Sequence, residues 1–225
     1  MTASRKKTFF ALFAAVALSL LVVIPSGATI IGGTVTGGSA YKAGGIFIRL
    51  TPPLANPRRS PDTVGNDTYQ TPNLYGFDED QNILLLADLA TDVGTNPLPA
   101  GTTVASHYVF FDPGPVQTMI GTVDFDADIL AIITSTDLLL ASDFLADTAV
   151  HYLNPKKRGL EPGDSVTING PREILFDTSA STPGDYVRVL TAFSAAAVPE
   201  PSTEYLFAVG LAAMGVLAKR FRYPG

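Results

Sequence analysis

The sequence predicts a mainly β fold: an antiparallel β-sandwich, with the jelly roll as one form of it, that carries one short helix. The chain has 17 Pro and 20 Gly among 225 residues, and these separate many short segments rich in β-branched and aromatic residues. Only one segment has a helical pattern. Apolar segments at both ends predict three parts: a signal peptide at 1–28, an exported domain at 29–194, and a linker, sorting motif, transmembrane helix and basic tail at 195–225.

The N-terminal segment has the three parts of a secretory signal peptide. Arg5, Lys6 and Lys7 form a basic start, and an apolar stretch follows at 8–24. Small residues then lead to Ala28, after which we expect signal peptidase to cleave. Because the apolar stretch is slightly long, an uncleaved anchor is the alternative.

The first half of the exported domain alternates between strands and Pro-rich or acidic turns. We expect residues 29–45 to be extended and partly loose, because they are rich in Gly, Ser and Thr. Four Pro residues make 51–71 a long surface loop. Residues 77–81 are expected to form an acidic turn. The strands expected in this half are 46–50, 82–89 and 103–111.

One helix is expected at Thr136–Asp147, with Thr136 as its cap and Asp137 in its first turn. Its spacing places Leu140, Phe144 and Leu145 on one face. The helix therefore interrupts an otherwise β-rich chain.

The remaining strands lie between turns that contain Pro and Gly. They are expected at 119–125, 129–134, 148–153, 165–168, 174–176 and 186–193. In the last strand, alternation places Val187, Val189 and Phe193 on one side and Arg188 on the other. We expect Val189 and Phe193 to be buried.

Charge and composition exclude two classes of function. The whole chain carries −6, but residues 29–194 hold nine basic and nineteen acidic residues, a net charge of −10. That charge leaves no basic surface for nucleic acid. The chain has no Cys, which excludes disulfides and thiol chemistry.

The sequence offers no catalytic set of residues, and we expect a protein that is not an enzyme. Ser106 and His107 are adjacent in an expected strand, so their side chains point to opposite faces. His151 is the only other histidine, and no Gly-x-Ser-x-Gly motif exists. With two histidines and no cysteine, little remains for a transition-metal site.

Two acidic segments are candidates for calcium. Asp124, Asp126 and Asp128 are spaced by two, which places them on one face if the strand continues. Asp78 and Asp80 belong to a second oxygen-rich group. An EF-hand is excluded because Ile129 and Ser135 stand where that loop needs Gly and Glu. A calcium site in a β-turn and an ordinary solvated turn remain as alternatives, and no other cofactor is expected.

Aromatic residues raise the possibility of sugar binding. Tyr69 and Tyr75 lie near the long loop, although the chain has no Trp, the best platform for a sugar face. An exopolysaccharide is therefore a candidate partner, and a secreted carbohydrate-binding or carbohydrate-cleaving protein is the alternative function.

The C-terminal segment has the order of a sorting address. It begins with Val198, Pro199, Glu200, Pro201 and Ser202, continues with a fourteen-residue apolar run at 205–218, and ends with Lys219, Arg220 and Arg222. Proline fixes φ and removes an N–H, so the first part is extended. The apolar run is shorter than the ~20 residues of a typical membrane helix, and the basic tail should stay cytoplasmic.

This order resembles the PEP-CTERM sorting signal of Gram-negative bacteria, whose Pro-Glu-Pro triplet is recognised by an exosortase. The resemblance implies an exported precursor that is held briefly in the inner membrane, with signal peptidase and exosortase as its processing enzymes. It also implies delivery to the cell surface or extracellular matrix. The resemblance covers the sorting segment only, so it names no ligand for the exported domain.

Overall fold

A computed structural model describes residues 27–52, 54–56 and 58–193 of the chain. The expected signal peptide apart from its last two residues, the sorting motif, the membrane helix and the basic tail lie outside these residues. Within the described ranges, no helix is both long and apolar enough to cross a membrane.

Most of the strands in the described chain belong to two sheets, which confirms the mainly β prediction. The smaller sheet has four antiparallel strands. In spatial order they are β1 (Ile30–Gly37), β8 (Gln117–Phe125), β12 (Glu173–Ala180) and β11 (Ser165–Gly170).

The larger sheet has seven strands and is mixed, because β2 runs parallel to β4. In spatial order its main path is β2 (Phe47–Arg49), β4 (Leu74–Asp78), β7 (Thr103–Phe111), β13 (Asp185–Ala192), β9 (Ile129–Ile133) and β6 (Val93–Gly94). The short strand β5 (Ile83–Leu84) pairs with the start of β7.

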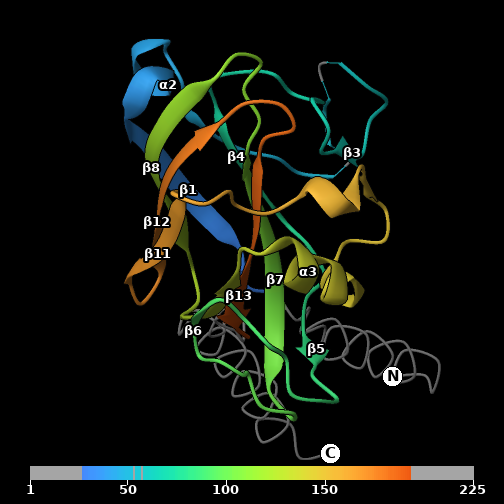
Figure 1. Ribbon diagram of the computed structural model, residues 1–225. Coiled ribbons are helices and arrows are strands. Elements are labelled where there is room, and N and C mark those ends of the chain that lie inside the picture. The colour runs from blue at the N-terminus through green and yellow to red at the C-terminus, as the bar shows by residue number, and fades with distance from the viewer. Residues whose placement is uncertain (1–26, 53, 57, 194–225) are drawn as a thin grey trace, which may run out of the picture. The chain divides into compact units, whose positions relative to one another are not determined.

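The two faces of the larger sheet are covered differently (Figure 1). One face packs on the smaller sheet through an apolar cluster to which both sheets contribute, for example Val109 and Val189 against Val123 and Phe176. The other face is covered by loops and by short elements. These are α3 (Thr136–Ala141), the 3-10 turns η1 (Asp143–Leu145) and η2 (Pro155–Lys157), and the parallel pair β3 (Thr63–Val64) and β10 (His151–Tyr152).

Aromatic rings fill the core under this second covering. Tyr75 stacks on Phe110 with ring centroids 5.2 Å apart, and Phe110 stacks on Tyr186 at 5.5 Å. Tyr69 closes the group from the long loop, 4.5 Å from Tyr75. Both tyrosines that we considered for sugar binding are therefore buried.

Several sequence predictions about elements were wrong. Residues 29–45 are extended in β1 as expected, but they are not loose, and they also contain the five-residue helix α2 (Gly38–Lys42). The acidic turn expected at 77–81 begins as the end of β4, and Glu79 is buried. The strand expected at 82–89 is reduced to the two residues of β5.

The expected helix and last strand were partly correct. The helix ends at Ala141, and its N-cap position is Ser135, whose side chain makes no capping hydrogen bond. Thr136 Oγ1 instead donates to the main-chain oxygen of Arg158. Leu139 and Leu145 are buried, whereas Leu140 and Phe144 are exposed, so the predicted apolar face was wrong. Val189 is buried as predicted, but Phe193, one residue beyond β13, is 39% exposed.

Candidate functional site

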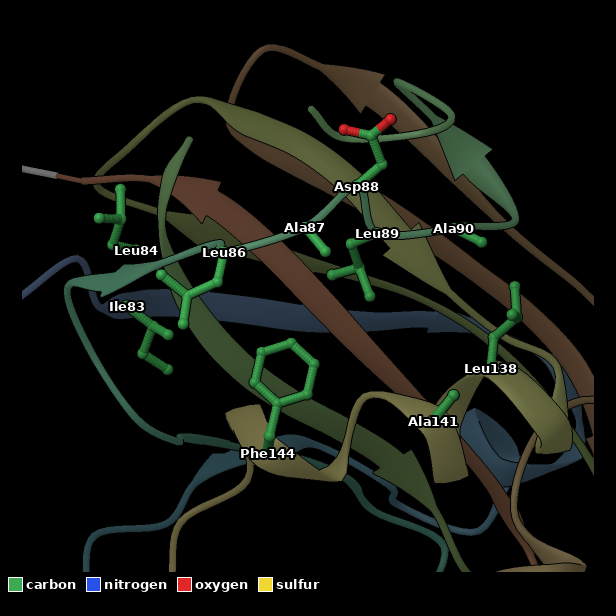
Figure 2. A pocket seen from close by; sticks show the side chains of 10 residues that line it. All are labelled: Ile83, Leu84, Leu86, Ala87, Asp88, Leu89, Ala90, Leu138, Ala141 and Phe144. Carbon is green, nitrogen blue, oxygen red and sulfur yellow. The ribbon is translucent and has the colours of Figure 1, made fainter. Parts of the chain in front are cut away.

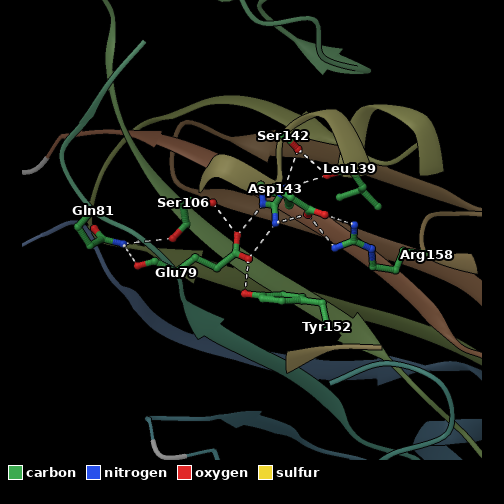
Figure 3. Close-up of polar contacts among 9 residues, drawn as sticks. Glu79, Gln81, Ser106, Leu139, Ser142, Asp143, Tyr152 and Arg158 are labelled. Carbon is green, nitrogen blue, oxygen red and sulfur yellow. Dashed lines mark hydrogen bonds and ion pairs between the residues drawn. The ribbon is translucent and has the colours of Figure 1, made fainter. Parts of the chain in front are cut away.

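A buried ion-pair network lies between the larger sheet and α3 (Figure 3). At its centre is Glu79, whose carboxylate accepts four hydrogen bonds. Oε2 accepts from Ser106 Oγ at 2.6 Å and from Arg188 Nε at 2.7 Å. Oε1 accepts from Tyr152 Oη at 2.6 Å and from Arg188 Nη2 at 3.0 Å. These bonds leave the carboxylate no lone pair for a substrate or an ion.

Arg188 is bound as completely as Glu79. Its Nη1 donates to Ser142 Oγ at 2.6 Å and to the main-chain oxygen of Leu139 at 3.2 Å, and its Nη2 also reaches Asp143 Oδ1 at 3.4 Å. Burial alone would lower the pKa of Arg188, but the charge and hydrogen bonds of Glu79 raise it. The arginine therefore links β13 to α3 as a permanent cation.

The network continues toward the surface through Asp143. Arg158 donates to both carboxylate oxygens of Asp143, at 2.9 and 2.7 Å. Burial and the neighbouring Glu79 charge raise the pKa of Tyr152, so this hydroxyl stays protonated and keeps donating. The arrangement joins distant segments and offers no free acid, base or nucleophile.

A second chain of polar groups passes through His107. Its Nδ1 lies 2.8 Å from Asp78 Oδ1 and its Nε2 lies 3.0 Å from Thr191 Oγ1. Carboxylate, imidazole and hydroxyl thus follow the order of a catalytic triad. However, His107 and Thr191 have no exposed surface, so a substrate has no access to the hydroxyl.

Asp78 and Ser106 are the neighbours of His107, the first in space and the second in sequence. Burial would raise the pKa of Asp78, but hydrogen bonding and charge from His107 lower it to about 2. Ser106 donates to Glu79 and His107 contacts Asp78, so adjacent side chains point to opposite faces as predicted. His151 lies elsewhere, exposed at the start of β10.

An apolar pocket of about 520 Å³ opens beside α3 (Figure 2). Leu86 from the segment after β5 faces Phe144 from η1, and they are 89% and 57% exposed. Asp88 is the only charged residue in the lining. A pocket with so few hydrogen-bonding groups suits an apolar surface better than a sugar.

The three aspartates near the end of β8 do not form one face. β8 ends at Phe125, where the sequence predicted its end, so the condition for one shared face, that the strand continue through Asp126 and Asp128, is not met. Asp126 Oδ1 accepts from the main-chain N of Thr29 at 2.7 Å, and Asp128 pairs with Arg172 at 2.8 Å. Burial and the charge of Glu173 raise the pKa of Asp124.

The second acidic group is also separated by the fold. Asp78 ends β4 and binds His107, whereas Asp80 lies near Asp147; burial first, and then this like charge, raises the pKa of Asp80. Among the described residues, no three His, Cys, Asp or Glu side chains are placed to hold a metal ion. Calcium binding remains a prediction.

Sequence reasoning missed two buried aspartates at one end of β7 and β13. Burial raises the pKa of Asp112 to about 6, helped by the nearby charge of Asp67 and opposed by the amide of Tyr69. Burial and the charge of Asp164 raise the pKa of Asp185 to about 7. Asp112 Oδ1 and Asp185 Oδ2 have no hydrogen-bond partner in the described part of the chain.

Ala28, the predicted last residue of the signal peptide, is buried beside Ala105 and Ala127. Thr29 follows it, directly before β1, and contacts two carboxylates, those of Asp78 and Asp126. The predicted cleavage position therefore borders a group of charged side chains.

Comparison with known proteins bears on the C-terminal segment. Residues 197–222 match the PEP-CTERM protein-sorting motif. The searches of curated proteins and of solved structures found no match to this chain. The match confirms the resemblance seen in the sequence and marks the chain as an exported protein that an exosortase handles.

Proposed function

Because the chain carries a PEP-CTERM protein-sorting motif, we propose that it is a non-enzymatic protein of the cell surface or extracellular matrix. The precursor is exported through its signal peptide and held in the inner membrane by residues 205–218. Exosortase then processes it at the Pro199-Glu200-Pro201 triplet. The match at residues 197–222 is the observation that carries this proposal.

The polar groups of the domain support a role without catalysis. Glu79 and Arg188 are saturated by hydrogen bonds within the protein. His107 and Thr191 have no exposed surface. Two pockets, the apolar one at Leu86 and Phe144 and a polar one near Asp124, suit binding better than bond cleavage.

The sorting step is tested by changing Pro199 and Pro201 to Ala. The substitutions restore two N–H groups and release the fixed φ values, so the segment loses its extended form. We expect export to continue while the chain accumulates in the inner membrane, which cell fractionation and immunoblotting would measure.

Pro162→Ala is the matched control, because Pro162 is exposed in a turn of the exported domain. The control should fractionate like the unchanged protein. If the variant with both sorting prolines replaced also fractionates like the unchanged protein, exosortase processing at this triplet is wrong.

A carbohydrate-binding domain is the second candidate. A pocket of about 550 Å³ near the end of β8 brings together Asp124, Asn169, Arg172 and Glu173, which supply the donors and acceptors a sugar needs. Depletion of the protein by immobilised polysaccharide, followed by a reducing-sugar assay, separates binding from cleavage. Retention that Glu173→Gln abolishes would favour this function over the first.

A further inference from the structure

The residue after the predicted cleavage position is held by two carboxylates. The main-chain N of Thr29 donates to Asp126 Oδ1 at 2.7 Å, and the main-chain N of Asp126 donates back to Thr29 O at 3.0 Å. Thr29 Oγ1 donates to Asp78 Oδ2 at 2.6 Å. The nitrogen that begins a chain cleaved after Ala28 therefore already lies against a carboxylate.

Only one of the two carboxylates has an ion-pair partner among the described residues. Asp78 lies 2.7 Å from Arg49 Nη2 through Oδ2 and 2.8 Å from His107 Nδ1 through Oδ1. Asp126 accepts only a hydrogen bond from the Thr29 nitrogen, which is a neutral amide before cleavage. A positive charge on this nitrogen would give Asp126 an ion pair.

Signal peptidase supplies that charge. Water adds across the Ala28–Thr29 peptide bond, Ala28 leaves with the new carboxylate, and Thr29 keeps the nitrogen as an amine. The usual pKa of an α-amino group is about 7.7 to 8.0, and two adjacent carboxylates favour its protonated form. The mature chain then begins with an ammonium 2.7 Å from the Asp126 carboxylate.

We propose that Asp126, assisted by Asp78, is the receptor for the α-ammonium of Thr29 that signal-peptide cleavage creates. This inference rests on the signal peptide of the proposed function. Thr29 leads directly into β1, which is an edge strand of the smaller sheet. The new ion pair fastens the free end of that edge strand, so export processing stabilises the folded domain.

Cleavage also has an opposing effect that the experiment must separate. It removes the methyl group of Ala28 from its contact with Ala105 and Ala127. A simple comparison of cleaved and uncleaved protein would mix this loss with the gain from the ion pair. A double-mutant cycle isolates the interaction between the chain start and Asp126.

The cycle uses two chains that both end at residue 225, purified in detergent. One begins at Thr29 and the other at Gly27, which moves the ammonium two residues away. In thermal melts at neutral pH, Asp126→Asn should lower the melting temperature of the Thr29 chain by about 2 to 4 °C more than that of the Gly27 chain. Asp124→Asn, two residues earlier in β8, is the matched control and should act equally on both chains.

Two further measurements distinguish the receptor from a merely structural Asp126. The extra effect of Asp126→Asn should disappear as pH rises through the pKa of the Thr29 amine, because the uncharged amine has no ion pair to lose. N-terminal sequencing of the exported protein should read Thr29 first. An equal effect of Asp126→Asn in the two chains, or a different first residue, overturns the proposal. A failure of exosortase processing alters only the C-terminal fractionation and leaves these results unchanged.

Discussion

Strand β13 carries two buried ionisable residues that differ in how far neighbouring groups satisfy their hydrogen bonds. Arg188, in the middle of the strand, and its partner Glu79 have their hydrogen-bonding groups filled by neighbours. Asp185, at the start of the strand, has an oxygen without a partner in the described residues, as does Asp112 beside it. The protein therefore buries an ion pair at one position and unpaired acids at the other.

The difference shows that burial alone does not decide how a charge affects stability. A buried ion pair is held in its charged form when every donor and acceptor is satisfied. A buried carboxylate without enough donors avoids the desolvation cost by keeping its proton. The first arrangement acts as a fixed connection between segments, and the second makes stability depend on pH.

The largest effect is expected from Arg188→Met. It leaves the Glu79 carboxylate buried without its cation, which typically costs about 3–5 kcal/mol. Because a domain is stable by about 5–15 kcal/mol, this variant should unfold at much lower urea concentration, as circular dichroism would record.

Two further variants define the source of that cost. Arg172→Met removes an exposed arginine that pairs with Asp128, and it should cost less than about 1 kcal/mol. Combining Arg188→Met with Glu79→Gln removes both buried charges and should recover part of the loss. If the double variant is no more stable than Arg188→Met alone, the unpaired carboxylate is not the cause.

The next largest effect is the pH dependence caused by Asp112 and Asp185. Their pKa values rise from 3.8 to about 6 and about 7, so the folded protein keeps protons that the unfolded chain releases. Stability is then greatest near pH 4 and falls as pH rises toward 7. For Asp112 alone the loss is about 3 kcal/mol, at 1.36 kcal/mol per pKa unit.

Urea unfolding at pH 5 and pH 8 tests this dependence. Asp112→Asn should make the difference between the two pH values smaller, whereas Asp177→Asn, at an exposed position on β12, should not. Asp78 works in the other direction: its pKa is lowered to about 2, so the stability that it contributes is lost as pH falls below 4. A protein more stable at pH 8 than at pH 5 would contradict the unpaired-acid interpretation.

The smallest effect concerns calcium at Asp124, Asp126 and Asp128. Asp126 already accepts a main-chain N–H and Asp128 already pairs with Arg172. Calcium prefers six to eight oxygen ligands, and we expect melts with millimolar calcium and with chelator to differ by less than about 1 °C. A larger shift that disappears in Asp126→Asn would instead establish the calcium site.

The sequence predicted the strands whose limits are set by local residues. β7 was placed correctly at 103–111, since a β-rich run there ends at Asp112-Pro113-Gly114-Pro115. β9 and β11 were also found between clear turns. β1 was expected only as part of a partly loose extended segment, and α2 was missed, because Gly and Thr weaken the local pattern. Pairing with β8 orders β1.

The buried network was not predictable from local sequence. Asp78, Glu79 and Asp80 have the composition of a solvated turn, and the partner of Glu79 lies 109 residues away. One signal was available: Arg188 is the only charged residue within the apolar segment 186–190. A charge in such a strand requires a buried partner, although the sequence does not say which acid supplies it.

The position of β13 also determines when the domain can fold during export. It is the last strand along the chain, yet it lies inside the larger sheet between β7 and β9. When a polypeptide crosses a membrane with its N-terminus leading, residues 185–192 emerge after every other strand and directly ahead of the sorting segment. Until then β7 and β9 lack their shared neighbour and Glu79 lacks Arg188. The larger sheet can therefore be completed only after residues 185–192 have crossed the membrane.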